Sequence, residues 1–242
     1  MSKNIIVTGC SRGLGLTIAL SLIAKGHVVY GISRTLTAEV SDMLKKHPEQ
    51  FYYKQYDFAN PVGIQESIFK NWIKNAIPIH GYVNNAAVAY DDIITNLNVD
   101  RLQNMFEVNV FSPFMMTKYA IRNMIVNRVK GSIVHLSSIS VHTGYKGLAM
   151  YAGSKGALEG FSKNTAREWG EKGIRSNCLV AGFMDTDMSS TLGEEMKDRI
   201  YKRTALKTPT SLESVAEMIS FLISDEAQSV TGQNIHVDSG TI

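Results

Sequence analysis

A tyrosine and a lysine four residues apart, Tyr151 and Lys155, are the residues in this sequence whose types and spacing most directly suggest chemistry. In a helix this spacing places two side chains on one face, with Cβ atoms about 6 Å apart. A lysine ammonium favours the phenolate form of a neighbouring tyrosine, so it lowers the tyrosine pKa from its ordinary value of about 10. We therefore expect Tyr151 to exchange a proton with a carbonyl or alcohol oxygen near neutral pH.

Ser138 lies thirteen positions before Tyr151, at the end of a strand-like run that begins at Ser132. Its hydroxyl is predicted to donate a second hydrogen bond to the same substrate oxygen. The residues after Lys155, 156–169, read as the continuation of an amphipathic helix. A tyrosine and a lysine at this spacing also occur on many half-buried helices with no function, so the interpretation depends on the rest of the chain.

The N-terminal part of the chain carries a glycine-rich turn between a short apolar strand and an apolar helix. The glycines are Gly9, Gly13 and Gly15, spaced G-x-x-x-G-x-G. Glycines allow backbone amides to approach a diphosphate closely, and a helix N-terminus favours its negative charge. This order of elements is the context that a dinucleotide site requires.

The end of the second predicted strand favours NADP(H) over NAD. An acidic residue usually binds the ribose 2′-hydroxyl of NAD at this position, but here Ser33 and Arg34 occupy it, and Arg12 lies within the glycine-rich turn. Arginine side chains suit a 2′-phosphate because their donors match its oxygens. The alternative is that Arg34 is a solvated loop residue.

Composition excludes several other classes of protein. The chain has 242 residues, a net charge of +3 and no block of lysines and arginines, which argues against nucleic-acid binding. No apolar run reaches the length of about 18 residues that a membrane span requires. The first strand begins almost at the N-terminus, so we expect no signal peptide and a cytoplasmic location. The two cysteines, Cys10 and Cys178, form no metal or disulfide pattern and are expected to be small buried residues.

Apolar strands alternate with helices along the whole chain, which predicts a doubly wound parallel α/β sheet of seven strands with helices on both faces. The expected strands are 4–8, 27–32, 51–56, 80–84, 131–137, 174–180 and 234–238. The expected helices run from the glycine-rich turn to about 25, then over 37–46, 61–74, 100–128, 156–169 and 211–223. We predict that 194–207 is irregular and that Pro113 kinks the helix just beyond Asn109. No linker or repeat interrupts the chain, so we expect one domain over 1–242, with a cofactor half at about 1–140 and a catalytic half at about 141–242.

Taken together, these motifs resemble the short-chain dehydrogenase/reductase family over almost the whole chain. The likeness rests on Thr8–Gly15, Asn84-Asn85-Ala86, Asn109, Ser138, Tyr151 with Lys155, and Thr186. Within the family the chain is most similar to the 3-oxoacyl-acyl-carrier-protein reductases. This closer likeness rests on Ser137-Ser138, the spacing of thirteen residues from Ser138 to Tyr151, the run from Gly182 to Met188, and the run from Phe221 to Glu226. The resemblance implies a Rossmann-like fold and NADPH-dependent reduction of a ketone.

The resemblance also implies roles for individual residues. Tyr151 would be the general acid/base, Ser138 would orient the substrate oxygen, and Lys155 would lower the tyrosine pKa and hold the nicotinamide ribose. Asn109 would anchor a water that links Lys155 to solvent; a satisfied core amide is the alternative for this residue. The residues expected to bind the cofactor are Gly9, Ser11, Arg12, Gly13, Leu14, Gly15, Ser33, Arg34, Asp57, Phe58, Asn85, Ala86, Ala87, Tyr151, Lys155, Gly182, Met184 and Thr186. Hydride transfer of this kind requires no metal.

Three residues depart from the family pattern: Ala87 and Ser239 stand where glycine is usual, and Ala181 where proline is usual. We expect Ala87 to disfavour a positive φ near the cofactor and Ala181 to loosen the entry to the substrate loop. None of the three changes removes a reacting group. They leave the substrate open between a 3-oxoacyl thioester and a sugar, polyketide or other small secondary alcohol.

Basic residues predominate between Met196 and Lys207, with five lysines and arginines against Asp198 alone. In short-chain dehydrogenases/reductases this segment belongs to a lid over the substrate, so a basic lid predicts an anionic substrate. A thioester on an acidic acyl carrier protein, a coenzyme A thioester and a nucleotide-linked sugar all fit this description. A solvated helix face is the equally weighted alternative. The family resemblance also implies a homotetramer packed through the helices of Asn109 and Tyr151 and through the C-terminal strand.

Overall fold

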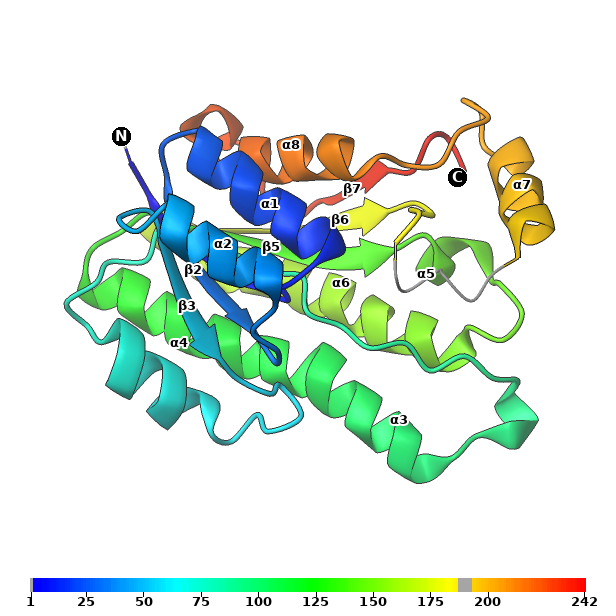
Figure 1. The fold of residues 1–242 in the computed structure, drawn as a ribbon. Helices are drawn as coiled ribbons and strands as arrows, with labels where there is room; N and C mark the ends of the chain where they lie inside the picture. The colour runs from blue at the N-terminus through cyan, green and yellow to red at the C-terminus, as the bar shows by residue number, and fades with distance from the viewer. Residues whose placement is uncertain (1, 187–192) are drawn as a thin grey trace.

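A parallel sheet runs through the computed structural model, which describes residues 2–186 and 193–242 (Figure 1). Within these residues seven strands pair in the order β3-β2-β1-β4-β5-β6-β7, and every pair is parallel. The strands are β1 (Asn4–Thr8), β2 (Val28–Ser33), β3 (Phe51–Gln55), β4 (Gly81–Asn84), β5 (Ser132–Ser138), β6 (Arg175–Ala181) and β7 (Asn234–Val237). The predicted doubly wound, seven-stranded sheet is confirmed.

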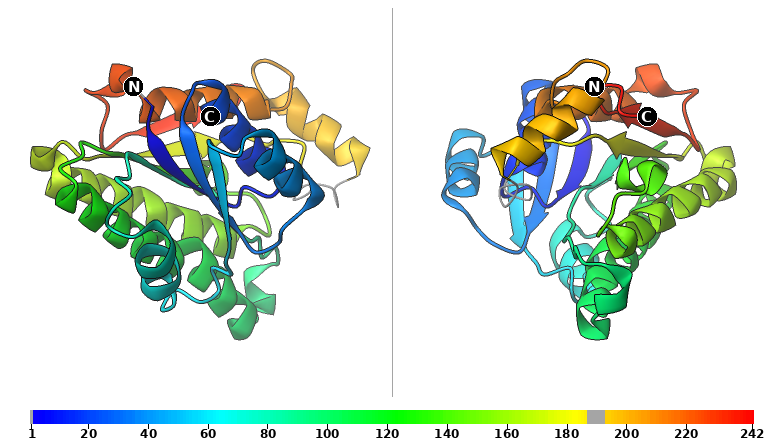
Figure 2. Two further views of the ribbon diagram at one scale, coloured as in Figure 1. Left: turned by 60° about the vertical axis from the view of Figure 1, so that its left-hand side comes forward. Right: turned by 90° about the vertical axis from the view of Figure 1, so that its right-hand side faces the viewer.

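Helices cover both faces of the sheet (Figures 1 and 2). One face carries α1 (Gly13–Ala24), α2 (Ala38–Lys46) and α8 (Leu212–Ile223). The other carries the π-helical η1 (Gln65–Ile73), the continuous helical stretch of α3 (Val99–Phe106), η3 (Glu107–Phe111) and α4 (Ser112–Val126), and then α6 (Ala149–Trp169). The short α5 (Ser140–Thr143) and α7 (Glu194–Arg203) lie beyond the carboxyl ends of the strands.

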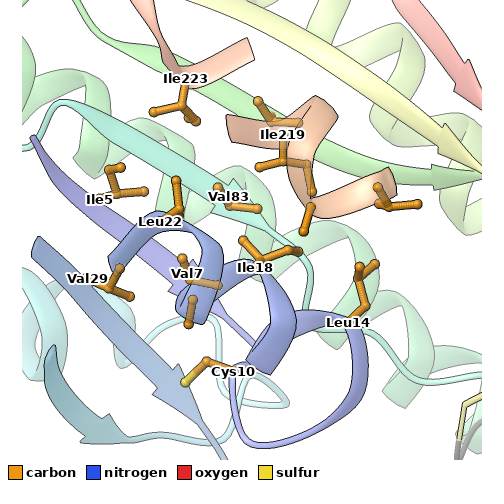
Figure 3. Close-up of a cluster of buried hydrophobic side chains, with 14 of the residues drawn as sticks. Ile5, Val7, Cys10, Leu14, Ile18, Leu22, Val29, Val83, Ile219 and Ile223 are labelled. Atoms are coloured by element: carbon orange, nitrogen blue, oxygen red, sulfur yellow. The ribbon is translucent and has the colours of Figure 1, made fainter. Parts of the chain in front are cut away.

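Two apolar layers fix these helices against the sheet. Figure 3 shows one of them, in which Ile18 and Leu22 of α1 and Ile219 of α8 meet Val7 of β1 and Val83 of β4. All five side chains are fully buried, and burying a side chain of this kind stabilises the fold by about 1.5–3 kcal/mol. The second layer lies on the opposite face, beneath η1 and α4. The two layers therefore fix the strands whose carboxyl ends carry the polar residues.

Three segments differ from the sequence-based expectation. The helix predicted for 61–74 begins only at Gln65. Pro113 lies in the first turn of α4, where proline is tolerated, and η3 forms a π-helical segment just before it, closed by a bond from the Ser112 N–H to the Glu107 carbonyl. Finally, the segment 194–207, predicted to be irregular, contains α7. The prediction was wrong because the basic side chains hid a helix that two glutamates, Glu194 and Glu195, favour in its first turn.

Both cysteines are buried, as expected, and burial raises the pKa of each thiol to about 12. They are therefore unreactive at neutral pH. Among the described residues, no helix is long and apolar enough to cross a membrane. No group of three or more histidines, cysteines, aspartates or glutamates in this part of the chain is arranged to hold a metal ion.

Candidate active site

Parallel pairing brings the predicted site residues to one edge of the sheet. The carboxyl ends of β1, β2, β3, β4, β5 and β6 all lie at the same edge, because parallel strands share a direction. Thr8, Ser33, Asn84, Ser138 and Ala181 are the last residues of five of these strands. Segments separated by more than a hundred residues in the sequence therefore meet at the carboxyl ends of the strands. An open α/β sheet binds its ligands in the crevice outside these strand ends.

The glycine-rich turn connects β1 to α1 and shapes the start of that helix. Gly9 and Gly13 adopt positive φ values of 71° and 50°, a region that favours glycine. A Cβ on Gly15 would lie 2.0 Å from the Gly9 carbonyl oxygen, so no side chain fits there. No acidic residue occupies the first turn of α1, which leaves its N-terminus favourable for a phosphate group. Ser11 and Arg12 lie on the turn itself, whereas Leu14 is buried in the core.

Thr8 and Asn85 join this turn to the segment after β4. The Thr8 hydroxyl accepts hydrogen bonds from the Asn85 N–H (3.0 Å) and the Ala86 N–H (3.1 Å). In return the Asn85 amide donates to the carbonyls of Thr8 (3.0 Å) and Gly9 (3.2 Å). Asn85 was predicted to line the cofactor, and the structure gives its side chain this bracing contact with the turn.

Arg12 and Arg34 lie on neighbouring loops, and both are exposed. The Thr37 hydroxyl, which also caps α2, donates to the Ser11 carbonyl at 3.0 Å and so ties the two loops together. Ser33 differs from the expectation for a phosphate ligand: it is only 3% exposed. Its hydroxyl is 3.0 Å from the Tyr53 hydroxyl and donates to the Thr35 carbonyl. The geometry favours the two arginines over Ser33 as phosphate ligands.

Asp57 and Phe58 follow β3 at the same edge of the sheet. Asp57 is exposed, and its carboxylate accepts the Ala59 N–H at 3.0 Å, which holds the turn. The Phe58 ring is buried and packs edge-on against Tyr56, while its carbonyl accepts the Ser112 hydroxyl at 2.5 Å. Of these two residues, Asp57 is the one whose side chain is accessible.

Tyr151 and Lys155 lie one turn apart in α6, as predicted. The Lys155 Nζ is 5.7 Å from the centre of the Tyr151 ring and donates to the Leu136 carbonyl of β5 at 2.8 Å. Lys155 is only 3% exposed, whereas Tyr151 is partly exposed. Ser138 lies two residues beyond Leu136, at the end of the same strand. The strand end and the helix therefore carry all three groups.

The pKa of Tyr151 does not follow the sequence-based expectation. Burial raises it above the ordinary value of 10, and the negative charge of Asp91 raises it further. Burial also lowers the pKa of Lys155 to about 8. The expected lowering was wrong for this structure because the Lys155 ammonium is directed to a backbone carbonyl and the cost of burying a phenolate dominates. Tyr151 is consequently a phenol at neutral pH, ready to donate its proton.

Asn109 lies in the π-helical η3 and is 1% exposed. Its amide exchanges two hydrogen bonds of 2.9 Å with the backbone of Val88 and donates to the Ser154 hydroxyl at 3.0 Å. Ser154 in turn donates to the Tyr151 carbonyl at 2.8 Å. The side chain of Asn109 thus braces α6 against the segment after β4, and it is a satisfied buried amide.

The segment after β6 passes over the glycine-rich turn. Gly182 donates to the Val237 carbonyl at 2.9 Å, and a Cβ on it would lie 2.2 Å from the Thr210 hydroxyl. Met184 packs against the core, and the Thr186 methyl lies 3.9 Å from the position of a Cβ on Gly13. The remaining motif residues, Asp187 and Met188, lie outside the described residues.

The ion pairs of α7 correct the expectation of a strongly basic lid. Lys197 pairs with Asp185 (2.9 Å) and Glu194 (3.2 Å), and Lys202 pairs with Asp198 (2.5 Å). Four basic residues of α7 face three acidic ones, because Glu194 and Glu195 begin the helix. Within the described residues, Arg199 and Arg203 carry no ion pair and are both exposed.

The three departures from the family pattern have different structural consequences. Ala87 does not adopt a positive φ, so the expected penalty is absent. Ala181 pairs with Ser138 and Val237 and is buried, so it does not loosen the chain. Only Ser239 takes a positive φ, of 56°. This is a conformation that a glycine would adopt without strain.

Sequence reasoning missed three residues of the site. The bracing role of Thr8 follows from its place at the end of β1, which was visible as part of the glycine motif. Asp91 gave no signal, since nothing in its spacing relates it to Tyr151. Ser140 also gave none; its two contacts with Ser138 depend on the short α5, which is too brief for a periodic pattern.

Comparisons with known proteins agree with this geometry. The family described as enoyl-(acyl carrier protein) reductase matches residues 9–241. The chain belongs to the short-chain dehydrogenase/reductase family. The 3-oxoacyl-acyl-carrier-protein reductase of Salmonella typhimurium is 33% identical over 98% of this chain and 96% of its own. The enzyme of the same name from Staphylococcus epidermidis is 30% identical over 99% of both chains.

A solved structure of a short-chain dehydrogenase/reductase matches the fold closely. The Agrobacterium tumefaciens protein, described as a 2-deoxy-D-gluconate 3-dehydrogenase with bound NADP, superimposes with a TM-score of 0.90. It is 25% identical, and the match covers 99% of this chain and 96% of that one. The predictions of a Rossmann-like fold and of an oxidoreductase are therefore confirmed.

Proposed function

We propose that this protein reduces a 3-oxoacyl thioester to the corresponding 3-hydroxyacyl thioester with NADPH. The chain is an NADP-dependent oxidoreductase that acts on CH–OH groups. One observation of geometry carries the proposal: Tyr151 lies one helical turn from Lys155, whose Nζ is 5.7 Å from the centre of the tyrosine ring, beside the strand end that carries Ser138. The substrate class rests on the full-length likeness to 3-oxoacyl-acyl-carrier-protein reductases.

The residues at the crevice fit a dinucleotide phosphate. Side chains are excluded at Gly15, and the positive φ values of Gly9 and Gly13 turn the backbone into the N-terminus of α1. We propose that the first amides of α1 bind the diphosphate and that Arg12 and Arg34 bind the 2′-phosphate. When bound, NADPH supplies the hydride that reaches the substrate carbon.

We assign the proton chemistry to α6 and β5. Tyr151 donates its phenolic proton to the substrate oxygen while Ser138 donates a hydrogen bond to the same atom. The Lys155 ammonium stabilises the phenolate that remains. Asn109 retains its proposed place in a proton path, through its carbonyl rather than its side chain. Pro113 has no N–H to offer that carbonyl in the α-helical manner, which supports a water as its partner.

An acyl carrier protein remains the proposed macromolecular partner, on a smaller basic surface than the sequence suggested. Arg199 and Arg203 lie four residues apart and hence on one face of α7. An acidic carrier would be attracted to this pair in a salt-dependent way. Changing both to glutamate should raise the KM for a carrier-bound substrate and not that for a neutral ketone. Lys202→Glu is the matched control, since Lys202 is already paired with Asp198.

A second candidate substrate is a hydroxylated ketone of the sugar-acid type. Asp91 is exposed in the loop after β4, and its charge acts on Tyr151. A carboxylate near the reacting oxygen would accept hydrogen bonds from substrate hydroxyls. The solved relative from Agrobacterium tumefaciens supports this candidate by its description.

A panel of ketones with NADPH and NADH, followed by absorbance at 340 nm, tests the proposal. Acetoacetyl thioesters, ethyl acetoacetate and a 3-oxo sugar acid represent the candidates. We expect the highest kcat/KM for the thioester with NADPH. A higher value for the sugar acid would favour the second candidate, and no reduction of any ketone would contradict the proposed function.

The cofactor assignment has its own variant. Arg34→Ala should raise the KM for NADPH about 10- to 150-fold, because a charge-assisted hydrogen bond is worth about 1.5–3 kcal/mol. The KM for NADH should barely change. Equal changes in the KM for NADPH and for NADH would indicate that Arg34 is a solvated loop residue and does not bind the 2′-phosphate.

Assembly and location also remain proposals. Phe111 is 48% exposed on the α4 face, and with Phe114 and Met115 it lines an apolar hollow of about 400 Å³. This surface supports the proposed homotetramer, which light scattering would test. A stable monomer at micromolar concentration would contradict it. A cytoplasmic location is likewise proposed.

A further inference from the structure

The hydroxyl of Ser138 accepts two hydrogen bonds from one residue, Ser140. The Ser140 N–H donates at 3.2 Å and the Ser140 hydroxyl donates at 3.0 Å. A serine oxygen has two acceptor positions and one proton. Since Ser140 fills both acceptor positions, the remaining hydrogen-bonding capacity of Ser138 is the donation of its own proton.

Ser140 is held in place by the packing around α5. It is 3% exposed, and the residue before it, Ile139, donates to the Ala181 carbonyl of β6 at 3.1 Å. Two residues later, His142 Nε2 lies 3.0 Å from a carboxylate oxygen of Glu159 in α6. Glu159 is the residue one turn beyond Lys155. The helix that carries Tyr151 and Lys155 therefore also fixes the position of Ser140.

The Glu159 anchor is itself fixed. It is 8% exposed and accepts hydrogen bonds from the Ser137 hydroxyl (2.5 Å) and the Asn234 amide (2.6 Å). A buried carboxylate with three such partners is costly to displace. The α5 turn is thus braced to β5, α6 and β7 at once, and a site built on such a turn is precise.

We propose that Ser140 is a positioning residue that makes Ser138 an obligatory hydrogen-bond donor to the substrate oxygen. Without the Ser140 hydroxyl, the Ser138 hydroxyl gains a free acceptor position and can rotate its proton away from the substrate. The donation from Ser140 also polarises the Ser138 O–H bond and strengthens its donation. A donor that is oriented in advance costs no reorganisation during the reaction. This inference rests on the role of Ser138 in the proposed function.

A double-mutant cycle on Ser138 and Ser140 tests the inference, with the best ketone of the panel and saturating NADPH. Removing one pre-oriented donor costs about 100- to 1000-fold in kcat, so we expect a loss of that order for Ser138→Ala. Ser140→Ala keeps the N–H donor and should lose a smaller factor, about 5- to 20-fold in kcat, with little change in the KM for NADPH. In the Ser138→Ala background, Ser140→Ala should have less than about a twofold effect.

Two further variants separate positioning from a structural role. Ser140→Thr keeps the hydroxyl and should recover most of kcat, while Ser140→Cys replaces it with a weakly donating thiol and should lose nearly as much as Ser140→Ala. Thr143→Ala is the matched control: it removes a hydroxyl of the same helix that donates to the Ile139 carbonyl at 2.9 Å and leaves Ser138 untouched. It should leave kcat within about twofold, as expected for sites that do not couple.

The outcomes distinguish the role of Ser138 from that of Ser140. If Ser138→Ala keeps normal kcat, the proposed role of Ser138 fails. If Ser138→Ala is impaired but Ser140→Ala and Ser140→Cys are not, the positioning role is overturned. Equal losses from Ser140→Ala with and without Ser138, or an equal loss in Thr143→Ala, would also overturn it, because they indicate a general disturbance of α5.

Discussion

The two sides of the crevice are held together by different forces. On one side, the glycine-rich turn, the segment Asn84–Val88 and α6 are joined by short hydrogen bonds between side chains and backbone, made by Thr8, Asn85 and Asn109. On the other side, α7 has a single buried residue, Lys197, and its ion-pair partners Asp185 and Glu194 are 58% and 90% exposed. Exposed ion pairs contribute about 0–1 kcal/mol.

We relate the backbone-braced side to the reaction itself and the α7 side to the choice of substrate. The backbone-braced side holds the groups that any ketone would meet, so its geometry is the same for every substrate. The α7 side is loosely attached and can change its sequence without disturbing the core, since it shares few buried contacts with it. We therefore expect variants of the first side to affect all substrates alike and variants of the second to affect them unequally.

The largest expected effect is that of Tyr151→Phe. It removes the proposed proton donor and keeps the ring, so kcat should fall by about 100- to 10,000-fold for every ketone. The affinity for NADPH, measured by fluorescence titration, should be nearly unchanged. Near-normal kcat would contradict the assignment of Tyr151 as the acid. A loss confined to one substrate would contradict the expectation that variants of the braced side affect all substrates alike.

Thr8→Val tests how strongly the hydrogen bonds of Thr8 brace the side of the crevice that carries the glycine-rich turn. The valine has the same shape but leaves the Asn85 and Ala86 N–H groups without their acceptor, and an unpaired buried group costs about 1–3 kcal/mol. We expect a loss of about 2–4 kcal/mol in the free energy of unfolding by urea. Thr8→Ser is the matched control and should lose much less. A loss below about 1 kcal/mol would show that the bracing is weak.

The pH dependence of kcat tests the buried lysine. The Lys155 ammonium is the form that stabilises the tyrosine phenolate, and with a pKa of about 8 this form disappears as the pH rises. The kcat for reduction should thus be level below pH 8 and fall about tenfold per pH unit above it. In Lys155→Arg the guanidinium stays charged, so its lower kcat should not fall over this range. If the wild-type protein and Lys155→Arg showed the same pH profile, the decline in kcat above pH 8 would come from another group.

Lys197→Met tests the α7 side. Since both partner carboxylates are exposed, the free energy of unfolding should drop by less than about 1 kcal/mol. The KM values for the ketone panel should change by factors that differ between substrates. If instead all substrates lost kcat equally, α7 would belong with the braced side.

The smallest effects are expected at the two positions where glycine is usual in the family. Ser239, which follows β7 and contacts the chain just after α7 through the Leu206 N–H, has a positive φ. Ser239→Gly should therefore raise the free energy of unfolding by about 0.5 kcal/mol. Ala87 has no such strain, so Ala87→Gly should lower it by about 0.5–1 kcal/mol. Urea unfolding of both variants measures the difference, and changes of the same sign would contradict the backbone argument.

The sequence by itself determined the order of strands and helices, because the apolar patterns that bury each element are local. It also determined the glycine-rich turn and the pairing of Tyr151 with Lys155, since one helical turn fixes a spacing of four residues. It did not predict that 194–203 is a helix, because Met196, Ile200 and Tyr201 are the only large apolar residues in this short and highly charged segment.

Only the tertiary structure decided how the site groups behave. The pKa of Tyr151 is raised by burial and by Asp91, sixty positions away in the sequence, and is not lowered as the neighbouring Lys155 had suggested. The charge of α7 was reduced by Asp185, which reaches Lys197 from the segment after β6. Ser140 could be recognised only once α5 had folded back onto Ser138. Desolvation and long-range pairing depend on which segments meet in space, and the sequence states only which segments exist.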